Sequence, residues 1–232
     1  MSPRTPAPRS RRERPAKAAL TYESIVATAV GLMATEGLQR VTMRRLAQEL
    51  DTGPASLYVY VANTAELHAA ILEELLGAVD LTPASEDGDW RDRLVRVLTS
   101  YTFVLFEHPA LAHSALVARP SGPNYLALVE SILALLYVGE VPDAQAAWGV
   151  DVLLQVATAT AAEQSTRART AGAEEEHNAL AATLRQASTE THPRIAALGE
   201  DLASGAPGLR LEWIFRSVIN GVRSTPREQG TD

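Results

Sequence analysis

The 232-residue chain contains no cysteine, and only 5% of its residues are aromatic. Without cysteine it has no disulfide framework, no thiolate nucleophile and no cysteine-based metal site, so we expect a reducing, cytoplasmic location. It also lacks an apolar run long enough to cross a membrane. Its basic N-terminus leads into Glu23 and Glu36 instead of the uninterrupted apolar core of a signal peptide. We therefore expect no membrane partner.

Catalytic sequence motifs are missing as well. There is no G-x-S-x-G, no glycine loop of the kind that binds phosphate, and no H-E-x-x-H. His108 and His113 are five residues apart, a poor spacing for two metal ligands on one helix face. The sequence therefore predicts no enzyme, no cofactor and no metal. A helical enzyme with its chemistry in the C-terminal half stays an alternative, and turnover of a candidate ligand would favour it.

Negative charge is unevenly distributed. The chain carries a net charge of −7, yet residues 1–19 hold six basic residues against one acidic residue, a net charge of +5. This segment is rich in proline and has no apolar period, so we expect a disordered basic arm. Such an arm either adds contacts to DNA phosphates or is a solvated tail without a specific role. Residues 224–232 are expected to form a frayed tail.

What the chain does contain is helical periodicity. The first apolar stripe comprises Ile25, Val26, Ala29, Leu32 and Met33. Thr21 is a suitable N-cap for this helix and Gly37 a suitable stop. Thr42 then caps a second helix, Pro54 opens a short third one, and Asn63 caps a fourth. Further helical patterns fill the rest of the chain, and strand-like alternation is weak. The predicted fold class is all-α.

The segment TGPASLYVYV, residues 52–61, follows the second helix after a tight turn that contains glycine. Two helices joined in this way form a helix-turn-helix, and the second helix of the pair enters the major groove of DNA. Leu57 and Val61 are four residues apart and can point inward, which turns Ala55 and Val59 outward. An exposed Ala-Val pair suits contact with thymine methyl groups.

Two tyrosines flank this pair. Tyr58 and Tyr60 place hydroxyl groups where DNA phosphates would lie, and Thr42 and Arg44 in the preceding helix can also reach a phosphate. The alternative is that the tyrosines only wedge the short helix against its neighbours, because half-buried tyrosines are common. The residues alone leave both interpretations open.

Residues 21–76 resemble the DNA-binding domain of the tetracycline-repressor (TetR) family of bacterial regulators. The resemblance is carried by IVATAVGLMATEGLQRVTMRRLAQELDTGPASLYVYVANTAEL. It implies an all-helical homodimer with a DNA-binding domain over 20–80 and a ligand-binding and dimerisation domain over 81–223. It further implies a small-molecule effector and a palindromic double-stranded operator, with repression as the commoner outcome. The implied DNA-contacting residues are Thr42, Arg44, Gly53, Pro54, Ala55, Ser56, Tyr58 and Tyr60.

The chain departs from the family pattern at two places. Many members have Gly-Val in the turn where this chain has Asp51 and Thr52, and many have a phosphate-binding lysine where this chain has Thr64. Residues 21–64 carry a net charge of −1. Our hypothesis is that the basic arm of residues 1–19 supplies the missing phosphate contacts.

The resemblance also implies a dimer interface, made by helices near 142–169 and 209–223. The small residues expected to allow close packing there are Ala157, Ala159, Ala161, Ala162 and Gly221. The alternative is that these helices belong to a monomer core. A two-fold protein predicts a two-fold operator.

A mostly apolar effector pocket is expected among the middle helices. The candidate lining residues are Tyr101, Leu105, Leu116, Leu133, Trp148, Asp151, Gln155 and Thr158. Asp151 stands in an apolar stretch, so its carboxylate needs a partner if it is buried. That partner is either the ligand or an arginine across the interface, or the face is wet. A DNA-binding dimer without an effector is a further alternative, and it would show a filled core.

Overall fold

The computed structural model describes residues 19–116 and 120–227, which form eleven α-helices and no β-strand. The all-α prediction is confirmed. The α-helices are α1 (Tyr22–Glu36), α2 (Met43–Glu49), α3 (Pro54–Leu57), α4 (Thr64–Leu76), α5 (Trp90–Phe106), α6 (Pro109–Ala115), α7 (Pro123–Val138), α8 (Asp143–Arg167), α9 (Ala173–Arg185), α10 (Pro193–Leu202) and α11 (Pro207–Ser224). Residues 1–18 of the predicted arm and 228–232 of the predicted tail lie outside the described residues.

The N-terminal head consists of α1, α2 and α3, and its helix ends follow the predicted signals. The side chain of Thr21 accepts a hydrogen bond from the backbone of Ser24, whose side chain accepts one from the backbone of Thr21. Gly37 ends α1 at a φ of 85°, a value that favours glycine. Thr42 caps α2 by accepting from the backbone of Arg45. The predicted apolar stripe of α1 is buried.

The turn between α2 and α3 adopts its backbone conformation without a glycine at the first position. Asp51 adopts a φ of 48°, in the left-handed region that aspartate tolerates better than most residues. This is the position at which the family resemblance leads one to expect glycine. Pro54 then starts α3, and Leu57 and Val61 are completely buried beneath it. The head therefore has a fixed inner side and an outer side that carries no core residue.

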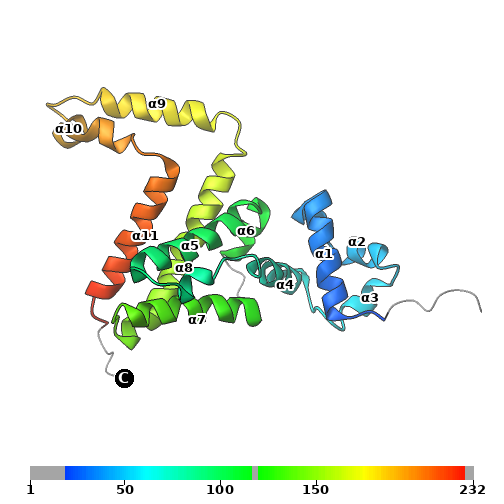
Figure 1. The fold of residues 1–232 in the computed structure, drawn as a ribbon. Helices are drawn as coiled ribbons and strands as arrows, with labels where there is room; N and C mark the ends of the chain where they lie inside the picture. Colours follow the sequence, from blue (N-terminus) through cyan, green and yellow to red (C-terminus); the bar gives the residue numbers. More distant parts are fainter. Residues whose placement is uncertain (1–18, 117–119, 228–232) are drawn as a thin grey trace, which may run out of the picture.

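Helix α4 connects the head to the rest of the protein (Figure 1). Asn63 caps it by accepting from the backbone N–H of Glu66, while the Glu66 carboxylate accepts from the backbone N–H of Ala62. The reciprocal bond is thus made one residue earlier than in a standard capping box. The helix packs on α1 of the head and on α6 and α7 of the body. This helix therefore contacts both the head and the body.

The body is built around α8, the longest helix, with 25 residues. It packs against α5, α6, α7 and α11, so it runs through the middle of the C-terminal part. Helices α9 and α10 form an antiparallel hairpin that projects from the body (Figure 1). Gly199 permits the close crossing of this hairpin, because a Cβ atom there would lie 2.7 Å from the carbonyl oxygen of Leu184. No described helix has the length and apolar character needed to cross a membrane.

Candidate nucleic-acid interface and ligand cavity

The outer side of the head presents the predicted DNA-contacting residues together. All eight are exposed: Thr42, Arg44, Gly53, Pro54, Ala55, Ser56, Tyr58 and Tyr60. Val59 is 81% exposed, on the side opposite the buried Leu57 and Val61. An apolar residue held so far out of the core by two buried neighbours can touch a partner without any rearrangement of the fold.

The two tyrosines differ in what their hydroxyl groups do. The Tyr60 hydroxyl donates a hydrogen bond to the carbonyl oxygen of Leu20, at 2.8 Å, and so ties the segment after α3 to the residues before α1. Its one hydrogen is used in this bond, so it has none to donate to a phosphate oxygen. Tyr58 is 54% exposed. The Tyr60 hydroxyl is therefore engaged within the head, whereas a phosphate contact by Tyr58 stays a prediction.

This difference predicts unequal effects of removing the two hydroxyl groups. Tyr60→Phe should lower the free energy of unfolding by about 1 kcal/mol, the usual net contribution of one hydrogen bond. Tyr58→Phe, made as the control, should leave the free energy of unfolding unchanged. Urea unfolding followed by circular dichroism measures both. Equal stability of the two variants would show that the bond to Leu20 contributes nothing.

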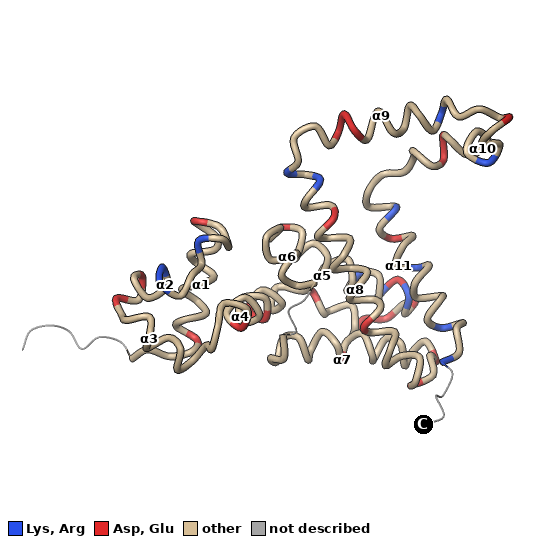
Figure 2. The backbone as a smooth tube through the Cα atoms, turned by 180° about the vertical axis from the view of Figure 1, so that it is seen from behind, with Lys and Arg blue, Asp and Glu red and all other residues tan. Residues whose placement is uncertain are grey.

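Positive charge on the head is limited. The Arg45 guanidinium pairs with the Glu36 carboxylate at 2.6 Å and with that of Glu49 at 2.8 Å, and these bonds raise its pKa. The pKa of Glu36 is lowered by the same contact. Arg44 is exposed. Figure 2 shows basic and acidic positions interspersed along the backbone of the head.

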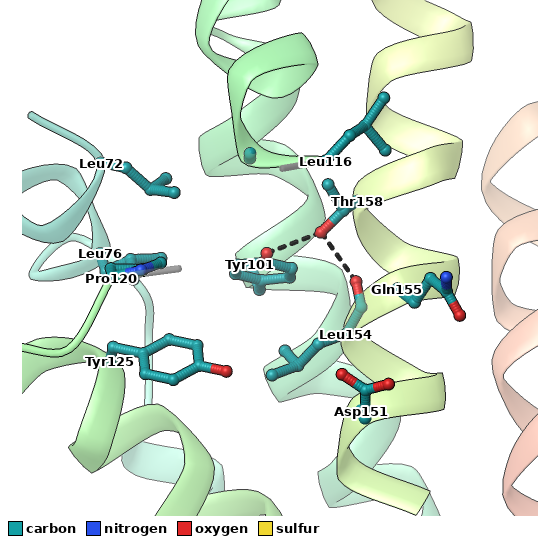
Figure 3. A pocket seen from close by; sticks show the side chains of 11 residues that line it. Leu72, Leu76, Tyr101, Leu116, Pro120, Tyr125, Asp151, Leu154, Gln155 and Thr158 are labelled. Carbon is teal, nitrogen blue, oxygen red and sulfur yellow. Dashed lines mark hydrogen bonds between the residues drawn. The ribbon is translucent and has the colours of Figure 1, made fainter. Parts of the chain in front are cut away.

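A cavity of about 90 Å³ lies where α4 meets the body. Its walls come from α4, α5, the α6–α7 region and α8 (Figure 3). The lining residues are Leu72, Leu76, Tyr101, Ala115, Leu116, Pro120, Tyr125, Asp151, Leu154, Gln155 and Thr158.

The structure brings together five of the eight predicted pocket residues. The five are Tyr101, Leu116, Asp151, Gln155 and Thr158. The other three lie elsewhere. Leu133 lines a neighbouring open groove of about 690 Å³ between α7 and α8, which shares Tyr125 and Asp151 with the cavity. Leu105 is completely buried in the core, and Trp148 is exposed, with the Arg227 guanidinium 4.0 Å from its ring centroid. Helical periodicity does not say which of several neighbouring helices a face meets, so the sequence could not separate these three residues from the five that line the cavity.

The cavity has one buried polar contact and a more open polar edge. The hydroxyl groups of Tyr101 and Thr158 are 2.7 Å apart, and both side chains are buried. Burial raises the pKa of Tyr101, so its phenol stays neutral at physiological pH. Asp151 and Gln155 are exposed residues one to two turns before Thr158 on α8. Most of the remaining wall is aliphatic.

A polar clamp joins α4 to α7 beside this cavity. The Glu73 carboxylate accepts from the backbone N–H of Asn124 at 2.6 Å and from that of Tyr125 at 3.3 Å. The Asn124 side-chain amide donates to the Glu73 carbonyl oxygen at 3.0 Å. Gly122 lies so close that a Cβ atom there would be 2.4 Å from the Glu73 carboxylate carbon. Glu73 thus caps α7 from a different helix.

A second polar contact joins α4 to α6. The Oγ of Ser114 lies 3.5 Å from Nδ1 of His68, at the limit of a hydrogen bond. Burial lowers the pKa of His68, which favours the neutral form of the ring. Its Nε2 atom is buried and has no hydrogen-bond partner among the described residues. The described residues contain no group of three or more histidine, aspartate or glutamate side chains able to hold a metal ion.

Both α8 and α11 expose large apolar side chains. They are Trp148, Val152, Leu209 and Trp213. Gly221 has open space where a Cβ atom would be, and Ala159 is exposed, so these two small residues can meet a partner. Ala157, Ala161 and Ala162 are buried in the chain's own core, so their predicted place at a dimer contact is wrong. Their small side chains instead serve packing inside this chain.

Two family models match the chain. The model of the tetracyclin repressor-like C-terminal domain matches residues 82–224, and the model of bacterial regulatory proteins of the tetR family matches residues 25–71. The chain belongs to the TetR family. The resemblance seen in the sequence is thereby confirmed.

Individual relatives of this TetR-family chain agree. An HTH-type transcriptional regulator of Saccharopolyspora erythraea is 33% identical over 120 residues, 52% of this chain and 50% of that protein, so the chain spans about half the length of this curated relative. The crystal structure of SCO7704 of Streptomyces coelicolor, described as a transcription regulator, shares 59% identity and covers 93% of this chain and 100% of its own, with a TM-score of 0.76. ActR of Streptomyces coelicolor in complex with actinorhodin shares 35% identity and covers 88% of this chain and 96% of its own, with a TM-score of 0.78.

Several cavity residues of this TetR-family protein escaped the sequence reasoning. Leu72 and Leu76 form a second apolar stripe beside the core-facing stripe of α4, and a helix with two apolar faces has two sets of neighbours. This second apolar stripe is the sequence feature that could have indicated Leu72 and Leu76 as cavity residues. No sequence feature indicates the role of Glu73, because its partners are 51 and 52 residues further along the chain.

Proposed function

We propose that this TetR-family chain is a ligand-responsive transcriptional repressor of the cytoplasm. It binds a palindromic operator as a homodimer, through two α3 surfaces in successive major grooves, and a small-molecule effector releases it. The observation that supports this proposal is that α4 makes two sets of contacts: it packs on α1 of the head, and it lines the cavity through Leu72 and Leu76.

The size of the cavity supports a conformational response. Ligand pockets of proteins usually measure roughly 300–1,000 Å³, and this cavity holds about 90 Å³. An effector can enter only if the walls part, and α4 is one of the walls. The effector then binds the open arrangement better than the closed one, and that difference in affinity is what shifts the head. The cavity also argues against a DNA-binding dimer with a filled core.

The complex of ActR with actinorhodin supports a small molecule as the effector. ActR shares the fold over 88% of this chain at 35% identity. We extend to this chain only the general class of ligand. The family description as tetracyclin repressor-like supports repression as the direction of the response.

The dimer is proposed to form through the exposed apolar side chains of α8 and α11. Trp213 on α11 is 70% exposed, which is unusual for a tryptophan that has no partner. Trp213→Glu should convert the dimer to a monomer and weaken operator binding at least tenfold, because one reading head then binds alone. Sedimentation velocity and operator titration measure the two effects. A Trp213→Glu variant that remains dimeric would place the interface elsewhere.

The proposal as a whole is tested by selecting bound genomic fragments with the purified protein and measuring their affinity by fluorescence anisotropy over a salt series. Recovery of a palindrome supports it. Weak, sequence-independent binding that disappears at moderate salt would mean that only nonspecific charge contacts exist, and it would overturn the reading function of α3. A chain that lacks residues 1–18 tests the arm hypothesis, because unchanged affinity and salt dependence would contradict it.

A further inference from the structure

The hydrogen atoms of the buried polar contact in the cavity can be assigned from the geometry. The Thr158 hydroxyl oxygen lies 2.7 Å from the carbonyl oxygen of Leu154 and 2.7 Å from the hydroxyl oxygen of Tyr101 (Figure 3). A carbonyl oxygen can only accept, so Thr158 donates its one hydrogen to Leu154. The bond between Thr158 and Tyr101 must then take its hydrogen from Tyr101.

This assignment fixes the polarity of the cavity wall. Tyr101 uses its one hydrogen on Thr158, so towards the cavity its hydroxyl oxygen offers lone pairs only. Tyr101 is 6% exposed and Thr158 is 5% exposed, so water has little access to the pair. Around it the wall is mostly aliphatic, with Leu72, Leu76 and Leu154, and the Tyr125 side chain also lines the cavity. The buried end of the cavity is therefore an apolar space with an acceptor and no donor at this pair.

We infer that the effector carries a hydrogen-bond donor, a hydroxyl or an N–H group, on an apolar body, and that this donor binds the Tyr101 oxygen. A ligand ether or ketone oxygen at the same place would face lone pairs and leave a buried acceptor unmatched, which costs binding free energy. The polar end of the ligand would lie towards Asp151 and Gln155 at the open edge. This inference rests on the proposed effector site.

Three probes of similar shape test the inference without knowledge of the natural effector. They are 2-naphthol, 2-methoxynaphthalene and 2-acetonaphthone, which present a hydroxyl, an ether and a ketone. Titration calorimetry of each against the full chain should show 2-naphthol binding about tenfold more tightly than the other two, the effect of one buried hydrogen bond.

Two variants separate the hydrogen bond from differences in probe size. Tyr101→Phe removes the acceptor and should abolish the preference for the naphthol. Thr158→Val removes the group that holds the Tyr101 hydrogen, so that hydrogen becomes available and the ketone should gain affinity about tenfold relative to the wild type. Thr102→Val is the matched control. Thr102 is a buried threonine that donates to the Leu98 carbonyl oxygen at 2.7 Å and does not line the cavity.

The outcomes distinguish this inference from the proposed function. Equal binding of all three probes to the wild type, or a naphthol preference that persists in Tyr101→Phe, overturns the inference and leaves the effector site standing. Absence of binding by every probe overturns the effector site and the inference together. The naphthol preference in the wild type, its loss in Tyr101→Phe and the ketone gain confined to Thr158→Val support it.

Discussion

Replacing Val59 with glutamate should lower the affinity for a selected operator about 100-fold and leave the protein folded. Val59 is 81% exposed, so its substitution removes nothing from the core. In the proposed complex it faces base edges between two rows of phosphates. A carboxylate there is repelled by the phosphates and loses its water without gaining a partner, at a cost of about 3 kcal/mol.

The control is the same substitution at another exposed valine. Val138 lies at the end of α7, 55% exposed, and is not part of the head. Val138→Glu changes the net charge by the same amount, so any general effect of charge on DNA association appears in both variants. Anisotropy titrations at one fixed salt concentration compare the two, and thermal unfolding checks that each is folded. Equal operator affinity in the two variants would remove Val59 and the turn that follows α3 from the proposed DNA interface.

The head was the part of the molecule that the sequence predicted most fully. The ends of its helices carry local signals such as Thr21, Thr42 and Pro54, and the inward positions of Leu57 and Val61 follow from a spacing of four. Local geometry of this kind depends on residues that are close in the sequence. The Tyr60 bond to Leu20 joins residues 40 positions apart, and no local pattern indicates it.

The body shows where sequence reasoning fails. Every helix there has apolar faces, and the sequence does not say which neighbour each face meets. Leu105 and Thr158 were predicted alike as cavity residues, yet the first is completely buried in the core while the second lines the cavity. Ala157, predicted for the dimer contact, is buried among the chain's own helices. Such choices depend on packing between segments that are far apart in the sequence.

Glu73→Ala should lower the free energy of unfolding by about 2 kcal/mol, because two backbone N–H groups at the start of α7 lose a charged acceptor. Glu73→Gln should lower it by about 1 kcal/mol, since the amide has one acceptor oxygen and its NH₂ group cannot accept from the second N–H. Glu74→Ala is the control, because Glu74 is its exposed neighbour on α4. Urea unfolding measures all three.

The same change should also weaken operator binding. Glu73 lies between Leu72 and Leu76 on α4, and the backbone that it caps belongs to Tyr125, a cavity residue. The clamp therefore fixes the position of α4, which connects the head to the body, relative to α7, which forms one wall of the cavity. Without it α4 moves more freely, and ordering it on DNA costs about 1 kcal/mol, or roughly fivefold in affinity. Wild-type operator affinity in a Glu73→Ala variant of reduced stability would restrict the clamp to a structural role.

Gly122 offers an independent way to break the clamp. An alanine there would place its Cβ atom 2.4 Å from the Glu73 carboxylate carbon, and the flexible carboxylate would have to leave the start of α7. The φ of Gly122 is −88°, which alanine adopts without strain. Gly122→Ala alone should therefore weaken operator binding as Glu73→Ala does, whereas adding it to Glu73→Ala should cost almost nothing further. The interaction free energy of this double-mutant cycle isolates the contact between the two residues. Additive effects would mean that Gly122 acts through something other than Glu73, and that the clamp does not set the position of α4.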